Sequence, residues 1–157
     1  MPARADTAPM PSSAHSEATA PRAVAAVGLA GVALIHLLDS IDKFAEVPYM
    51  GWMYVGLIVA TLATAAVLVR AHVREAWIAA AAFPAAAIVG FVLTRTVGLP
   101  QATGDIGNWS EPLGLASLFV EGAVIALSVY ALAALHPVRW VHRRTHPALS
   151  REAPAAR

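Results

Sequence analysis

The sequence predicts an all-α membrane protein, a bundle of four antiparallel transmembrane helices. The chain has 157 residues, of which 58% are hydrophobic and only 13% charged, whereas soluble domains are about one quarter charged. Its mean hydropathy is +0.61. Four apolar segments of roughly 20 residues each match a hydrocarbon core of about 30 Å. Their short connections make neighbouring helices antiparallel, so we expect one transmembrane domain, residues 22–135.

The first apolar segment covers residues 23–38 and follows a tail rich in Pro, Ala and Ser. That tail, residues 1–21, has no apolar periodicity, so we expect it to be disordered and cytoplasmic. The apolar segment ends in the polar stretch 39–43 (DSIDK), without a small-residue cleavage site. It therefore predicts a retained helix to about residue 45 rather than a secretory signal.

The other three segments have recognisable boundaries. Residues 49–69 open with Tyr and Trp side chains, which favour the level of the lipid headgroups. Residues 76–96 contain Pro84, where we expect a kink. Residues 112–135 follow Ser110, an expected helix cap, and begin at Pro112, which suits a first helical turn. The basic tail 136–157 is expected to begin as an interfacial cytoplasmic helix.

The positive charges predict the orientation. Nine of the eleven Lys and Arg residues lie in the two tails, at Arg22 directly before the first segment, or between the second and third segments. By the positive-inside rule, both termini are cytoplasmic. The opposite side then collects six of the ten acidic residues, which are Asp39, Asp42, Glu46, Asp105, Glu111 and, deeper in the membrane, Glu121.

Small residues at a spacing of three or four predict the faces through which the helices pack, because lipid supplies no hydrophobic drive between them. We expect the fourth helix to pack through Gly114, Ser117, Glu121 and Ser128. The stripes expected for the other three helices are Ala26, Ala30 and Ala33; Gly56, Ala60 and Thr64; and Ala82, Ala86, Gly90 and Thr94.

Three polar residues within the apolar segments are candidates for a binding site. Glu121 follows Pro112 by nine residues and is expected about 13 Å inside the fourth helix. A carboxylate at that depth needs a partner or a proton. Arg95 ends the third segment and is expected to pair with Glu121, Glu111 or Asp105. We also expect Arg95 and Glu121 to be energetically coupled, directly or through one bridging group. The alternative for each is a structural residue that locks two helices.

His36 lies about two turns before the end of the first helix, at a depth similar to that of Glu121. Histidine with carboxylates suits a divalent metal ion or a proton relay, so His36 and Glu121 are candidate metal ligands. A histidine that is merely hydrogen-bonded in the core is the alternative. The whole candidate binding site comprises His36, Arg95, Glu121, Asp39, Asp105, Glu111 and Ser117.

The motif TRTVGLP at residues 94–100, followed by EPLG at 111–114 and by Glu121, resembles a group of small bacterial four-helix membrane proteins. That group combines [ST]RTVG[LI]P, a short acidic loop, E-x-[VL]-G or EPLG, and an acidic residue in the last helix. The resemblance covers residues 24–135 and implies the fold, the location of the site and the bacterial inner membrane. It implies no activity.

Two function classes remain open. In the first, the polar cluster binds or passes a proton, a metal ion or a small polar solute. In the second, the protein is a structural or accessory subunit of a membrane complex, or a homo-oligomer. The chain has no cysteine, phosphate-binding glycine loop, nucleophile elbow or HExxH motif, so catalysis is a third class, less favoured than the other two. The expected surroundings are lipid, and no nucleic acid.

Overall fold

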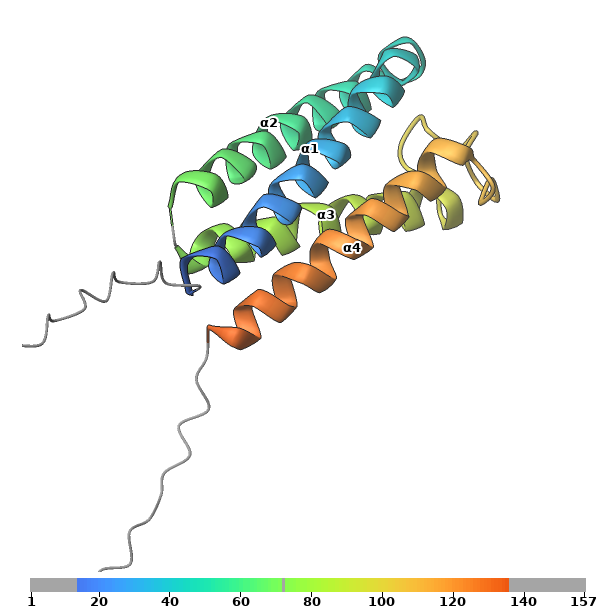
Figure 1. Cartoon of the computed structure of the whole chain (residues 1–157). Coiled ribbons are helices and arrows are strands. Elements are labelled where there is room, and N and C mark those ends of the chain that lie inside the picture. The colour runs from blue at the N-terminus through green and yellow to red at the C-terminus, as the bar shows by residue number, and fades with distance from the viewer. Residues whose placement is uncertain (1–13, 72, 136–157) are drawn as a thin grey trace, which may run out of the picture.

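The structure, a computed structural model that describes residues 14–71 and 73–135, confirms the predicted all-α bundle. Its four helices are α1 (Ala14–Glu46), α2 (Pro48–Arg70), α3 (Arg74–Thr96) and α4 (Pro112–Ala134). Each is long and apolar enough to cross a membrane. The helices run antiparallel in chain order (Figure 1). We call the end with Val47 and residues 97–111 the loop end, and the end with residues 71–73 the turn end.

The helix boundaries agree with the predictions for α2, α3 and α4 within two residues, but not for α1. Because α1 begins at Ala14, residues 14–21 belong to a helix, and the predicted disordered tail was wrong for them. Ser110 was also wrong as a cap, since Glu111 occupies that position and Pro112 starts the helix as expected. Residues 1–13 and the predicted interfacial helix of the basic tail lie outside the described residues.

The turn end holds the larger apolar core. Arg22 is buried beside it, and its Nε donates to the carbonyl oxygen of Leu68 at 2.6 Å and its Nη2 to that of Val69 at 2.8 Å. The last carbonyls of a helix lack partners within it, so Arg22 closes the end of α2. The core beside it consists of Ala25, Leu29, Leu68, Ala76, Trp77, Ala80 and Val124.

The helices pack closely at a few glycines, and most of the predicted faces of small residues do not lie in the helix contacts. A Cβ atom at Gly28 would lie 2.5 Å from Val124 Cγ2, and one at Gly114 would lie 2.5 Å from Phe91 Cε2. The stripe predicted for α4 is correct, because Ser117, Glu121 and Ser128 are all buried. In the other three helices the stripes fail at Ala30, Gly56, Ala82 and Ala86, which are exposed.

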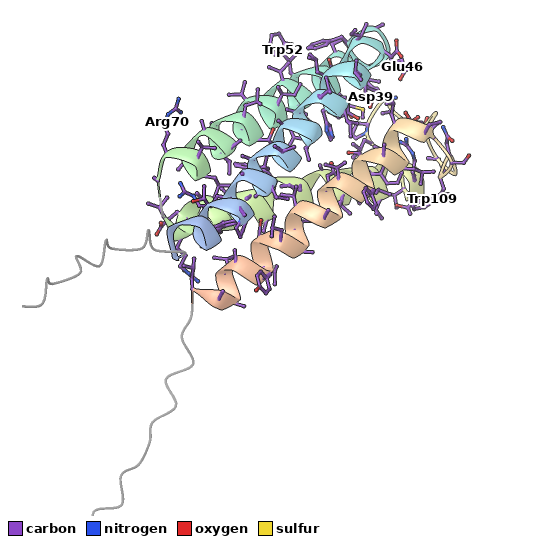
Figure 2. The ribbon with its side chains drawn as sticks, in the orientation of Figure 1. Asp39, Glu46, Trp52, Arg70 and Trp109 are labelled. Atoms are coloured by element: carbon purple, nitrogen blue, oxygen red, sulfur yellow. The ribbon has the colours of Figure 1, made fainter. Side chains whose placement is uncertain are left out.

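The outward surface of the bundle is apolar, as contact with lipid tails requires. Phe119 is 79% exposed and Val27 is 73% exposed. Trp52 and Arg70 point away from the bundle near opposite ends of α2 (Figure 2). The chain is therefore a multi-pass membrane protein by the length, composition and exposed surface of its helices.

Candidate functional site

A cavity of about 310 Å³ lies in the loop-end half of the bundle, between α2, α3 and the polar faces of α1 and α4. It exists because α2 and α3 pack together at the turn end and diverge toward the loop end (Figure 1). Gly56 of α2 and Gly90 of α3 line it, and a Cβ at either would meet no atom within 4 Å. Its apolar lining includes Ile35, Met50, Met53, Leu57, Ala60, Phe83, Ala86, Ala87, Phe91, Leu99 and Leu113.

His36 and Glu121 meet at the inner wall of this cavity. His36 Nε2 lies 3.7 Å from Glu121 Oε1, so the two residues share a depth in the bundle as predicted from the sequence. His36 is 8% exposed and Glu121 only 1%. Ser117, one turn earlier on α4, donates a hydrogen bond to the same Oε1 at 2.7 Å. The second oxygen, Oε2, accepts no hydrogen bond from the part of the chain that the structure describes.

The geometry around His36 indicates that this pair holds a proton. His36 Nδ1 lies 3.0 Å from the carbonyl oxygen of Val32, and a carbonyl oxygen can only accept. Nδ1 must therefore carry a hydrogen, which leaves a lone pair on Nε2 of a neutral imidazole. A lone pair facing an ionised carboxylate would be repulsive. The pair is therefore an imidazolium with a carboxylate, or a neutral imidazole with a carboxylic acid.

Tyr54 belongs to the site, although the sequence placed it only in an aromatic belt. Its hydroxyl donates to Asp39 Oδ2 at 2.9 Å, and its ring meets the ring of His36 edge to face at 5.0 Å. Asp39 projects from α1 on the side of the loop end (Figure 2). No sequence signal distinguishes Tyr54 from the other aromatic residues that open α2, because its role depends on which way α2 is rotated.

Arg95 is bound to the loop that follows it and not to Glu121. Its Nη2 donates to Glu111 Oε2, its Nη1 lies 3.2 Å from Asp105 Oδ2, and its Nε donates to the carbonyl oxygen of Asn108 at 2.8 Å. Nη1 also donates to the Thr94 hydroxyl. Of the three acidic partners expected from the sequence, the structure provides Glu111 and Asp105. Glu121 instead faces His36.

Asp105 links this network to α1. Its Oδ2 accepts from Lys43 Nζ at 3.1 Å, and Lys43 also binds Glu46 at 2.9 Å. Asp105 does not line the cavity, unlike the other six candidate binding residues. Asp105 thus belongs to the polar cluster but lies outside the lining of this cavity.

The TRTVGLP segment has a structural explanation in this loop. Gly98 adopts φ +75°, the left-handed conformation that glycine favours after a helix, and its N–H donates to Leu93 O. Pro100 and Gln101 (φ +63°) occupy the centre of a tight turn closed by Ala102 N–H and Leu99 O at 2.8 Å. The motif thus turns the chain back so that the residues around Asn108 meet Arg95.

The predicted metal site finds no support. Across residues 14–71 and 73–135, no three His, Asp or Glu side chains are close enough to hold a metal ion. His36 and Glu121 would provide two ligands, fewer than the three or four protein ligands usual for zinc.

No protein-family model, no curated protein and no solved structure matches this chain. The resemblance of its TRTVGLP and EPLG segments to the small bacterial membrane proteins therefore stays a prediction.

Proposed function

We propose that this protein binds a small molecule in the cavity between α2, α3 and α4. The observation that supports this most is Glu121, which is 1% exposed, lines the cavity and leaves one carboxylate oxygen without a hydrogen bond among the described residues. A buried charged group is costly in a membrane unless a partner satisfies it. A ligand in the cavity would supply that partner, and the volume is at the lower end of the range for small-molecule sites.

Binding is favoured over passage across the membrane. Most of the residues that line the cavity lie in the loop-end half of each helix, and the two exceptions, Ala60 and Phe83, lie within two residues of the midpoints of α2 and α3. Toward the turn end the bundle is filled by the apolar cluster around Leu29, Leu68 and Trp77. A proton or polar solute would find no continuous row of cavity-lining groups through that cluster.

The second function class, a structural role, fits a different part of the polar cluster. Arg95, Asp105, Glu111 and Lys43 satisfy one another and fix the loop to α1 and α3. We assign this network to holding the bundle together at the loop end. His36, Glu121, Tyr54 and Asp39 form the part that we assign to binding.

We propose that the loop end faces the outside of a bacterial inner membrane. The charge distribution supports this orientation, because nine of the eleven Lys and Arg residues belong to the tails and the turn end. A ligand would then reach the cavity from the outer leaflet or the outer solution.

Native mass spectrometry tests the binding function. Protein extracted from its own membrane in mild detergent should carry a non-covalent small molecule. Gly90→Leu should abolish this mass, because the side chain at Gly90 would fill the cavity. Gly122→Leu is the matched control, since Gly122 is also helical with open space beside it and does not line the cavity. A wild-type protein without any bound mass, or a mass retained by Gly90→Leu, would contradict the proposal.

A further inference from the structure

The charged residues that line the cavity do not balance. Glu111 is paired with Arg95, which leaves Asp39 and Glu121 as the other two acidic groups of the lining. Glu121 has only His36 within ion-pair distance, and Asp39 has no Lys or Arg there among the described residues. The cavity therefore presents two carboxyl groups against one imidazole.

Among the polar side chains that line the cavity, hydrogen-bond acceptors without a partner outnumber donors without one. Arg95 donates hydrogen bonds to Thr94, Asn108 and Glu111, and its Nη1 also lies 3.2 Å from Asp105 Oδ2, so its guanidinium group is directed at these partners. By contrast, Glu121 Oε2 and the second carboxylate oxygen of Asp39 accept nothing from the helices and loops described. The site thus offers free acceptors and few free donors. A ligand that complements it must donate hydrogen bonds and carry positive charge.

The remaining lining indicates that most of the ligand is apolar. Leu57, Phe83 and Ala87 form the walls, and the rings of Phe83 and Tyr54 can also contact a cation through their faces. Met53, Gly56 and Ala86 line the cavity and are themselves exposed. The cavity is therefore open on the lipid-facing side between α2 and α3, where a molecule dissolved in the bilayer can enter.

We infer that the ligand is an amphipathic cation, an amine whose ammonium group lies between Asp39 and Glu121 and whose apolar part lies against α2 and α3. This inference rests on the proposed binding function. An ammonium group has three donors and no acceptor, which matches the free oxygens. A carboxylate ligand would instead face the carboxylate of Asp39 and a His36–Glu121 pair without net positive charge, in a region of low dielectric constant where like charges repel strongly.

Three probes with one apolar body and different heads test the charge preference. The protein is placed in nanodiscs of zwitterionic lipid and titrated calorimetrically with 4-phenylbutylamine, 4-phenyl-1-butanol and 4-phenylbutyrate, with empty nanodiscs subtracted. The amine should bind at least about tenfold more tightly than the alcohol, equivalent to about 1.4 kcal/mol, and the carboxylate should bind most weakly.

Two variants test the residues. Glu121→Gln and Asp39→Asn should each lower the affinity for the amine by about tenfold and leave that for the alcohol nearly unchanged. Asp42→Asn is the matched control, because Asp42 is an exposed carboxylate on the same helix that does not line the cavity. It should change neither affinity.

The outcomes separate the inference from the function on which it rests. If the alcohol or the carboxylate binds as tightly as the amine, the cavity binds ligands but the inferred positive charge is wrong. The same holds if neither variant weakens binding of the amine. If none of the three probes binds above the empty nanodiscs, the proposed binding function is itself wrong.

Discussion

His36 Nε2 and Glu121 Oε1 face each other at 3.7 Å, from helices at opposite ends of the sequence. Each is oriented by a residue of its own helix, His36 by the Val32 carbonyl and Glu121 by the Ser117 hydroxyl. The distance between them is longer than a hydrogen bond. Arg95 and Glu111, by contrast, are in direct contact. The first pair is thus loosely held beside a cavity, and the second is a tight structural contact.

Removing both partners of the loose pair should not destabilise the protein. We expect His36→Leu with Glu121→Met to leave the free energy of unfolding unchanged or to raise it by about 1–4 kcal/mol, as is common when apolar residues replace a buried pair. His36→Leu alone should cost about 1–3 kcal/mol, because Glu121 loses its partner. Unfolding in mixed micelles by SDS titration measures all three. A large loss in the double variant would assign this pair to the architecture instead of to binding.

Removing one partner of the tight pair should be costly. Arg95→Ala is expected to lower the free energy of unfolding by about 3–5 kcal/mol, since it strands Glu111 and leaves Asp105 with Lys43 as its remaining partner. Glu111→Gln should be milder because it leaves no unpaired negative charge. Arg70→Ala, an outward-pointing arginine at the turn end (Figure 2), serves as the control and should change stability by less than about 0.5 kcal/mol.

A double-mutant cycle distinguishes the two possible partners of Arg95. Arg95 with Glu111 should show a coupling of about 0.5–3 kcal/mol, whereas Arg95 with Glu121 should be additive within about 0.5 kcal/mol. The second expectation revises the coupling predicted from the sequence, because Arg95 contacts Glu111 and Asp105, and Glu121 contacts His36. A strong coupling between Arg95 and Glu121 would restore the original prediction.

The glycines should divide into two groups when replaced by alanine. Gly56→Ala and Gly90→Ala place a methyl group in open space, so the gain in helix propensity should stabilise each by about 0.5–1 kcal/mol. Gly28→Ala and Gly114→Ala force a Cβ to within 2.5 Å of Val124 and Phe91 and should cost about 1–3 kcal/mol. Thermal unfolding in detergent gives the signs. If Gly56→Ala and Gly90→Ala destabilised the protein as much as the other two substitutions, α2 and α3 would have to pack against each other in the folded protein, without the open space beside these glycines.

The orientation in the membrane is tested by reporter fusions. A reporter of cytoplasmic location fused after Arg157 should be active, and one inserted in residues 101–109 should be inactive, because the excess of Lys and Arg lies at the turn end and in the tails. A periplasmic reporter should give the opposite results at both sites. A periplasmic signal at Arg157 would place the cavity on the cytoplasmic side.

The number of helices, their antiparallel order and the lengths of α2, α3 and α4 could be predicted from the residues alone. A transmembrane helix satisfies its own backbone hydrogen bonds, and the bilayer sets its length, so local hydropathy is sufficient. The buried face of α4 was also predictable, because Ser117, Glu121 and Ser128 are polar residues on one stripe of an apolar helix.

Which residues meet was decided by the rotation and divergence of the helices, to which hydropathy is insensitive. The Ala-rich α1, α2 and α3 have similar sides, so the stripes through Ala30, Gly56 and Ala86 did not predict their buried faces. The sequence alone allowed Arg95 to pair with any of three acidic residues. In the structure, the turn through Gly98 and Gln101 places Glu111 beside Arg95, whereas Glu121 lies beside His36. The cavity arises from the divergence of α2 and α3, a relationship between two helices that neither segment encodes by itself.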